Sequence, residues 1–349
     1  MLVSYSQAIR EAQAYLLENH SEVVLCGINV ESPSGVFGTS LGFFEKYGPS
    51  RIIEFPAAEN GTTGIAIGMA IRGARPIIIH HRVDFAILSM DALVNQAAKI
   101  HYMYGGKLKA PIVVRLIIGR GWGQGPQHSQ SLQAWFAHIP GLKVYMPILA
   151  SDAYQMLIHA TLDDAPVVIL EHRWLYDLEE EVQELTTPKS LQSTRVALSG
   201  ADITLVGFSY MGIENRRAAE ILGKIGIRAE VIDILSLQPI DLSPILVSIR
   251  KTKRLIIADT AQIEYGASAE ILSRIAESGF SDFIEAPVRI GLPFSPTPTA
   301  PDLSAVFYPR AIHVARKAAQ LCGENPSNLE DIDEGEHLDV PSKLFKGPY

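Results

Sequence analysis

Short apolar runs alternate with segments of helical periodicity through most of this chain, and no other feature limits its fold as strongly. Strands are predicted at residues 23–27, 76–80, 111–118, 143–146 and 167–171. Helices are predicted at residues 6–18, from Glu59 onward, at 90–104 and at 153–160. Alternation of this kind over short connections favours a largely parallel sheet with helices on both faces.

A second region of the same kind follows a polar stretch that contains the acidic run Glu179–Glu181. Strands are predicted at 203–208, 228–234, 255–259 and 288–291, and helices at 215–225, 244–251, 267–278 and 309–321. We therefore expect an α/β protein of two doubly wound domains, residues 1–178 and 196–322, joined by a linker at 179–195. Residues 323–349 mix proline, serine and acidic residues, which predicts a flexible acidic tail or an arm that wraps a partner.

Composition excludes several classes of function. The formal charge of -8 argues against a nucleic-acid partner, which would need clustered lysine and arginine. No apolar run approaches the roughly 20 residues of a membrane-spanning helix, so no membrane association is expected. Charged residues at Arg10, Glu11 and Glu18 do not fit a secretory signal, and two cysteines are too few for a disulfide framework. The expected location is the cytoplasm.

Three side chains stand out as candidates for chemistry. Glu59 opens a glycine-rich segment with Gly61, Gly64 and Gly68, and its carboxylate can either cap a helix or form half of a cofactor site. Phe85 is either a core aromatic or a ring that stacks on a ligand. His128 follows a glycine-rich loop at 119–125, where an imidazole is either solvated or available for proton transfer.

These residues, with Asn95-Gln-Ala-Ala-Lys99 and Gln127-His-Ser-Gln130, occur at spacings that resemble one family. It is the family of beta subunits of thiamine-diphosphate-dependent 2-oxo-acid dehydrogenases, within the transketolase group. The resemblance extends to about Leu321 and is strongest over residues 35–175. It implies a transketolase-like pyrimidine-binding domain followed by a transketolase C-terminal domain. It also implies an enzyme that decarboxylates a 2-oxo acid and passes the acyl unit to a lipoyl group or another acceptor.

The resemblance implies a role for each candidate. Glu59 matches the glutamate that hydrogen-bonds a ring nitrogen of the thiamine pyrimidine and drives the cofactor to its reactive form. Phe85 matches the aromatic residue placed against the pyrimidine face. His128 matches the histidine that faces the substrate and helps acyl transfer. A K⁺ ion is implied as well, with Ile112, Ala160 and Asp163 at the positions of its ligands, most of which are backbone carbonyls.

A missing motif points to a partner. Thiamine enzymes of this group hold the cofactor diphosphate through Mg²⁺ with a Gly-Asp-Gly segment, and no such segment occurs here. The Mg²⁺ and the diphosphate are therefore expected on a separate alpha chain, in an alpha2beta2 heterotetramer, and the beta chain alone is expected to be inactive. A lipoyl acyltransferase is a further possible partner.

Three segments depart from the family pattern. Gly27-Ile-Asn-Val30 lacks an acidic pair, His80-His81-Arg82 replaces a more apolar or hydroxyl-bearing segment, and Glu171-His-Arg-Trp174 introduces an arginine and a tryptophan able to bind an anion or stack on a ring. His80 and His81 would point to opposite faces of a strand, which disfavours a metal site. Arg82, with His81 beside it, either clamps a substrate carboxylate or pairs with Asp84 or Asp91.

Two other functions stay open at this point. One is the beta-type half of a split transketolase-like enzyme that transfers a ketol unit in a specialised pathway. The other is a noncatalytic scaffold subunit, since a fold alone does not establish activity. The presence of Glu59, Phe85 and His128 together favours an enzyme over the scaffold.

Overall fold

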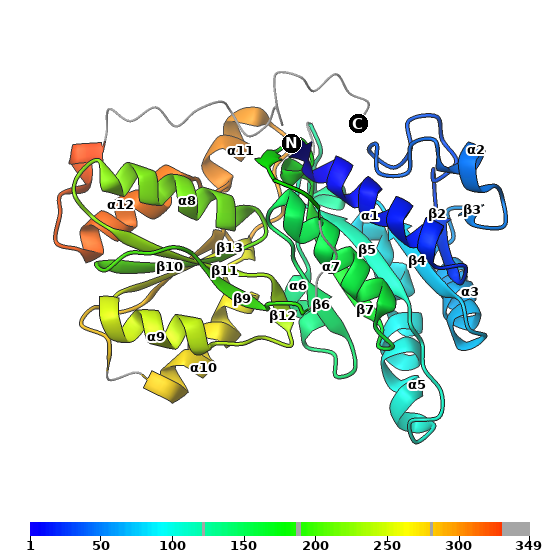
Figure 1. Cartoon of the computed structure of the whole chain (residues 1–349). Coiled ribbons are helices and arrows are strands. Elements are labelled where there is room, and N and C mark those ends of the chain that lie inside the picture. Colours follow the sequence, from blue (N-terminus) through cyan, green and yellow to red (C-terminus); the bar gives the residue numbers. More distant parts are fainter. Residues whose placement is uncertain (121–122, 186–189, 280–281, 330–349) are drawn as a thin grey trace. The chain divides into compact units, whose positions relative to one another are not determined.

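The chain forms two compact units in a computed structural model that describes residues 1–120, 123–185, 190–279 and 282–329. The first unit comprises residues 1–118 and 135–191. The second comprises residues 119–134 and the chain from Gln192 onward. Figure 1 shows the order of helices and strands along the chain. The segment Gly119–Ala134, which carries His128, therefore belongs to the second unit by its packing.

A parallel sheet forms the centre of the first unit. Its strands are β2 (Val23–Gly27), β3 (Ile52–Glu54), β4 (Arg75–His80), β5 (Val113–Ile118), β6 (Lys143–Tyr145) and β7 (Val167–His172). Within the unit they lie in the order β6-β7-β5-β4-β2-β3, and every neighbouring pair is parallel. All residues of β2, β5 and β7 are buried, as expected for strands that are covered on both faces.

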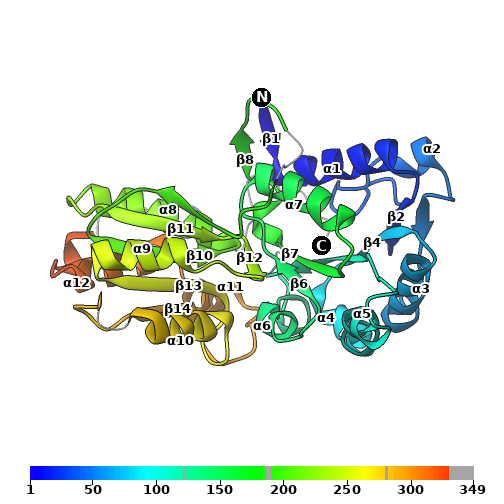
Figure 2. The same ribbon diagram turned by 60° about the horizontal axis from the view of Figure 1, so that its bottom comes forward.

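Helices cover both faces of this sheet. On one face α1 (Tyr5–Asn19) packs along α7 (Ala150–Leu162), and on the other lie α3 (Glu59–Ile71), α4 (Val83–Ala86) and α5 (Ala98–Met103), as Figure 2 shows. Helix α1 begins at a capping box in which Ser4 and Gln7 exchange hydrogen bonds. Two shorter helices are α2 (Phe43–Tyr47) and α6 (Gln133–Ala137).

The second unit contains a sheet with the order β14-β13-β10-β11-β9. Its strands are β9 (Thr194–Leu198), β10 (Ile203–Phe208), β11 (Ala229–Ile234), β13 (Leu255–Gln262) and β14 (Val288–Leu292), and only the edge strand β9 is antiparallel to its neighbour. Figure 1 shows α8 (Tyr210–Gly223) and α12 (Ala311–Leu321) on one face, with α9 (Ser243–Thr252) and α10 (Ala267–Gly279) on the other. A short strand β12 (Ser236–Gln238) and helix α11 (Pro301–Phe307) complete the unit.

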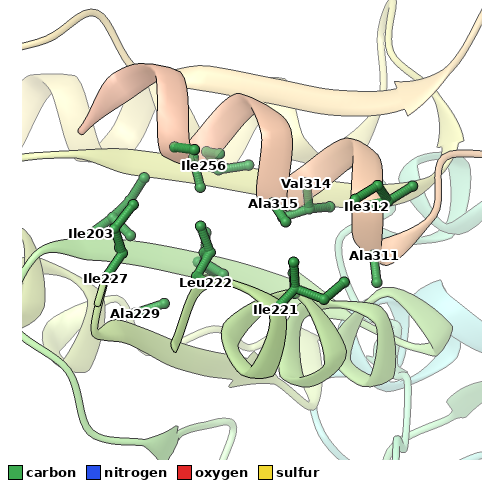
Figure 3. Packing of buried hydrophobic residues seen from close by; sticks show 14 of the residues in the cluster. Ile203, Ile221, Leu222, Ile227, Ala229, Ile256, Ala311, Ile312, Val314 and Ala315 are labelled. Atoms are coloured by element: carbon green, nitrogen blue, oxygen red, sulfur yellow. The ribbon is translucent and has the colours of Figure 1, made fainter. Parts of the chain in front are cut away.

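The core beneath α8 and α12 is aliphatic. Figure 3 shows Ile221 and Leu222 of α8 facing Ile256 of β13 and Ala315 of α12, all of them buried. Alanines along α12 allow the two helices to approach closely, because small side chains shorten the distance between helix axes. Leu329 is fully buried in the same core, so the first residues of the predicted tail are part of the second unit. Residues 330–349 lie outside the described residues.

The two doubly wound α/β units confirm the predicted fold class, and most predicted elements lie within a few residues of the observed ones. The predicted helix over 90–104 is present, but its middle is not a regular α-helix. A 3₁₀ turn at Ile87–Ser89 leads into a π-helix at Ala92–Ala97 before α5 begins, and periodicity does not reveal such an inserted residue. The start of the predicted linker is also a strand, because β8 (Glu179–Glu181) pairs antiparallel with β1 (Leu2–Ser4).

Candidate active site

Glu59 is the first residue of α3, and its side chain is only 8% exposed. Its carboxyl group makes no hydrogen bond or ion pair with any residue that the structure describes. The helix cap that a carboxylate at this position can provide is therefore not formed, and the capping residue Ala58 supplies no side-chain bond either. A nearly buried carboxyl group without a protein partner is able to accept or share a hydrogen with a ligand.

The backbone around Glu59 is held by hydroxyl groups. Thr62 Oγ1 donates to the carbonyls of Ala58 (3.2 Å) and Glu59 (3.3 Å), and Ser89 Oγ donates to the carbonyl of Glu59 (2.8 Å). Thr62 and Ser89 are buried. Sequence reasoning did not single out Ser89 because nothing in its local pattern indicates that it reaches a residue 30 positions earlier.

Phe85 lies on the short helix α4 and is 37% exposed, so it is not a buried core aromatic. Its amide donates to the carbonyl of Arg82 (3.1 Å), which fixes the turn that presents the ring. A partly exposed aromatic ring on an ordered turn can stack on a flat ligand with little further loss of side-chain entropy.

His80, His81 and Arg82 follow one another at the carboxyl end of β4. His80 and Arg82 are each 3% exposed. Burial, assisted by the positive charge of Arg82, lowers the pKa of His81, so its imidazole is neutral at pH 7. His81 Nδ1 is buried and has no hydrogen-bond partner among the described residues. Asp91, one of the acids considered for Arg82, accepts a hydrogen bond from Asn95 Nδ2 (2.6 Å).

The segment Glu171-His-Arg-Trp174 covers the carboxyl end of β7 and the start of the 3₁₀ turn that follows it. All four residues are buried. Arg173 stacks its guanidinium on Phe37 and Tyr176, at 4.8 and 5.3 Å from the ring centroids, and Trp174 packs against His172. The suggestion that the arginine and the tryptophan serve a ligand is therefore not supported, because both are committed to internal contacts.

The segment Gly27-Ile-Asn-Val30, which contains no acidic residue, is held by Glu54 of β3. Glu54 accepts hydrogen bonds from the amides of Asn29 (2.6 Å) and Glu31 (3.1 Å), and its charge acts on His81. Asn29 adopts a positive φ of 60°, a conformation that asparagine tolerates better than most residues.

His128 closes a 3₁₀ turn at Pro126–His128 in the second unit and is partly exposed. The loop that carries it is anchored within that unit: the Arg120 guanidinium donates to the carbonyls of Pro298 (2.9 Å) and Thr299 (2.7 Å), and Gln133 Nε2 donates to Asp259 Oδ1 (2.6 Å). Burial raises the pKa of Asp259 to about 6. These anchors were not predicted, because they join residues more than a hundred positions apart.

Of the three residues suggested for K⁺, Ile112 immediately precedes β5, Ala160 lies in the last turn of α7, and Asp163 caps the end of that helix. The Ile112 carbonyl accepts from Val167 N (2.9 Å) and the Ala160 carbonyl from Asp163 N (3.3 Å), which leaves each oxygen a second lone pair. The Asp163 carboxylate is bound by Lys143 and by Ala165 N, so its side chain is not free to coordinate an ion. Backbone carbonyls are therefore the donors that fit a monovalent cation here.

Among the described residues, no group of three or more histidine, cysteine or acidic side chains is arranged to hold a metal ion. Over the same residues, no helix combines the length and the apolar character needed to cross a bilayer.

Comparisons with known proteins match the whole arrangement. The family described as "Transketolase, pyrimidine binding domain" matches residues 2–179, and "Transketolase, C-terminal domain" matches residues 193–314. A pyruvate dehydrogenase E1 component subunit beta-2, mitochondrial, from Oryza sativa subsp. japonica is 36% identical over 90% of this chain and 85% of that protein. The corresponding beta subunit from Dictyostelium discoideum is 37% identical over 93% of this chain and 92% of its own length.

Two other relatives broaden the comparison. An acetoin:2,6-dichlorophenolindophenol oxidoreductase subunit beta from Cupriavidus necator is 33% identical over 90% of this chain and 96% of its own length. A solved structure titled "Split gene transketolase, inactive beta4 tetramer" superimposes with a TM-score of 0.72 at 20% identity, over 92% of this chain and 99% of that one. At that identity the structural likeness establishes the fold alone.

Proposed function

The chain belongs to the family of beta subunits of thiamine-diphosphate-dependent 2-oxo-acid dehydrogenases, and we propose that Glu59 and Phe85 hold the pyrimidine ring of that cofactor. The observation that carries the proposal is the carboxyl group of Glu59, which is nearly buried and has no partner among the described residues. When bound, thiamine diphosphate supplies the electron sink that allows a 2-oxo acid to lose CO₂.

Glu59 acts on the cofactor through a hydrogen bond. The carboxyl group is nearly buried and has no partner among the described residues, so a ring nitrogen of the pyrimidine can be its hydrogen-bond partner. Phe85 restricts the orientation of the same ring by stacking. Both side chains belong to the first unit, and each is presented by the first turn of a helix or by a short helical turn.

His81, Arg82 and His128 are the proposed substrate residues. Arg82 supplies a permanent positive charge that suits the carboxylate of a 2-oxo acid, and the neutral His81 offers a ring nitrogen that lacks a described partner. His128, on its anchored loop, moves a proton or stabilises a developing oxyanion when the acyl unit is transferred to a lipoyl group or another acceptor.

The proposed assembly is an alpha2beta2 heterotetramer. Support comes from the absence of a Gly-Asp-Gly segment in this sequence, which leaves Mg²⁺ and the cofactor diphosphate to an alpha chain. Docking on a lipoyl acyltransferase and a cytoplasmic location belong to the same proposal, although several relatives are named as mitochondrial proteins. The carbonyls of Ile112 and Ala160 support K⁺ as a structural ion of the first unit.

A second substrate class is favoured by one specific relative. The Cupriavidus necator protein is named for acetoin, a hydroxyketone without a carboxylate, and it is 33% identical to this chain. Acetoin is therefore the alternative substrate to test beside 2-oxo acids. No observation of comparable strength supports a ketol-transferring split transketolase, since that likeness reaches only the fold.

The experiment that tests the proposal is reconstitution with the alpha chain, followed by assay of 2-oxo acids, acetoin and ketose phosphates. We expect thiamine-dependent turnover of an oxo acid or acetoin by the complex, and none by the beta chain alone. Glu59→Gln should lower turnover by at least about 10²-fold, the size expected for losing a positioned acid or base, while the complex still assembles. Near-normal turnover of Glu59→Gln would overturn the role of Glu59, and ketol transfer without CO₂ release would reassign the enzyme class.

A further inference from the structure

A continuous chain of buried hydrogen bonds runs from His80 to the backbone of Glu59. His80 Nε2 lies 2.9 Å from Thr63 Oγ1, Thr63 Oγ1 donates to Ser89 Oγ (2.9 Å), and Ser89 Oγ donates to the Glu59 carbonyl (2.8 Å). Thr63 and Ser89 are fully buried and His80 is 3% exposed. Polar groups buried to this extent rearrange only at substantial cost, so the chain has one stable geometry.

The donor and the acceptor of each hydrogen bond between His80 and Glu59 follow from counting hydrogens. A hydroxyl group has one hydrogen, and Ser89 gives its own to the Glu59 carbonyl, so Ser89 accepts from Thr63. Thr63 has then used its hydrogen and must accept from His80. His80 therefore carries its proton on Nε2. Burial lowers the pKa of His80 to about 4, which keeps the ring neutral and the direction unchanged at physiological pH.

These hydrogen bonds connect three separate segments of the first unit. His80 ends the central strand β4, Thr63 lies in the helix that begins with Glu59, and Ser89 ends the 3₁₀ turn that follows the Phe85 helix. Ser89 thus ties the segment of Phe85 to the first turn of α3. That turn has no side-chain cap from Ala58, so its geometry depends on contacts of this kind.

We propose that His80, Thr63 and Ser89 are positioning residues that set Glu59 and Phe85 in the mutual geometry that the pyrimidine ring requires. The inference rests on the proposed function, because it assigns a purpose to the position of Glu59. None of the three touches the cofactor in this scheme; they act through the backbone of Glu59 and through the turn after Phe85. Misplacement of a reacting group by about 1 Å can lower a rate about 10²-fold. Loss of one of the three hydrogen bonds can therefore slow the reaction by shifting Glu59.

The first test uses the complex with the alpha chain, loaded with thiamine diphosphate. The measured quantity is the rate at which the thiazolium C2 proton exchanges with D₂O, since Glu59 is proposed to promote loss of that proton. Thr63→Val removes the hydroxyl at nearly constant volume, and we expect exchange to slow by about 10- to 100-fold. Thr63→Ser restores the hydroxyl and should recover most of the rate. His80→Gln keeps an N–H donor, so C2 proton exchange should be faster in the His80→Gln complex than in the His80→Leu complex.

A second readout does not depend on the cofactor. In the cofactor-free complex, amide hydrogen exchange by mass spectrometry should rise in the peptide covering residues 58–68 when Thr63 is valine. A peptide covering β10 in the second unit should be unchanged, because no bond of the chain reaches it. Ser89→Ala, which deletes only the bond to Glu59 and the acceptor for Thr63, provides a milder variant if Thr63→Val does not assemble.

The outcomes separate the inference from the proposed function. If Glu59→Gln retains normal C2 proton exchange, the proposed role of Glu59 fails. If Glu59→Gln loses exchange while Thr63→Val or Ser89→Ala stays within about twofold of the unaltered complex, the proposed function stands and the positioning role is overturned. The positioning role would also be overturned if C2 proton exchange were no faster in Thr63→Ser than in Thr63→Val, and no faster in His80→Gln than in His80→Leu. Loss of packing alone would then explain the slower exchange.

Discussion

Burial fixes the protonation state of the histidines at the carboxyl ends of β4 and β7. His80 and His172 are 3% and 2% exposed, and burial lowers their pKa values to about 4 and about 3. His172 is neutral in the structure, since its Nδ1 accepts a hydrogen bond from Trp174 N (3.2 Å). A neutral ring beside Arg82 and Arg173 avoids adding a third positive charge to the interior.

These histidines predict a loss of stability in mild acid. An unfolded histidine titrates near 6.5, so below that pH the unfolded chain binds a proton that the folded chain excludes until about pH 4. The stabilisation is complete above pH 6.5, and the free energy of unfolding falls by about 1.4 kcal/mol per pH unit for each histidine as the pH drops toward 4. Urea unfolding at pH 7 and pH 5 measures this slope.

His172→Asn should flatten that slope by the share of one histidine, because asparagine keeps an acceptor for Trp174 N but does not titrate. His138→Asn is the matched control for the substitution itself, since His138 is exposed. Comparing the pH slopes of the variants removes the contribution of the carboxyl groups, which are the same in each protein. Equal slopes in His172→Asn and the unaltered protein would contradict the prediction.

Arg82 predicts which substrate class the complex prefers. If its guanidinium binds the carboxylate of an oxo acid, Arg82→Met should raise KM for the oxo acid by about 10- to 100-fold, the range expected for a charge-assisted hydrogen bond. The value of kcat/KM for acetoin, which has no carboxylate, should change by less than about threefold. Steady-state kinetics with both substrates make the comparison, with Arg72→Met, at an exposed position, as the control. An equal loss for both substrates would assign Arg82 a structural role.

Two elements of the first unit are joined by a buried ion pair. Arg115 of β5 donates Nε and Nη2 to the two carboxylate oxygens of Glu171 on β7, at 2.6 and 2.8 Å. Nη1 reaches Gln13 of α1 (2.8 Å), and Tyr176 Oη donates to Glu171 (2.5 Å). The network therefore ties the sheet to a helix that is distant in sequence. The charged groups of Arg115 and Glu171 are both hydrogen-bonded within it.

Removing one member of this pair should be more damaging than removing both. Arg115→Met leaves the Glu171 carboxylate buried without its counter-charge and should lower the free energy of unfolding by about 3 to 5 kcal/mol. The double variant Arg115→Met, Glu171→Met should recover a large part of that loss, because no charge is then stranded. Urea unfolding of the unaltered protein, the single variant and the double variant measures the three free energies of unfolding. A single variant within about 1 kcal/mol of the unaltered protein would refute the argument.

At the scale of the whole molecule, the chain repeats one architectural solution in two units with different strand orders. Each has a mainly parallel sheet with helices on both faces, and in the first unit the candidate residues His81 and Arg82 follow the carboxyl end of β4. Carboxyl ends of parallel strands are where such folds bind ligands, because the loops that follow them converge there.

The sequence by itself determined the succession of strands and helices, the two α/β regions, and the residues that carry the family resemblance. These follow from local periodicity and from side-chain types at given spacings, both of which can be read along the chain. The short strands β1, β3, β8, β9 and β12 and the π-helix were not predicted, because so few residues give little periodicity and an inserted residue disturbs it.

Only the tertiary structure decided what those residues contact. It left the Glu59 carboxyl without a described partner, turned Arg173 and Trp174 inward, and grouped the His128 loop with the second unit. It also joined His80 to Glu59 through Thr63 and Ser89. The physical reason is that such contacts depend on how distant segments pack, as Arg115 and Gln13 illustrate across 102 positions, and no local pattern encodes that packing.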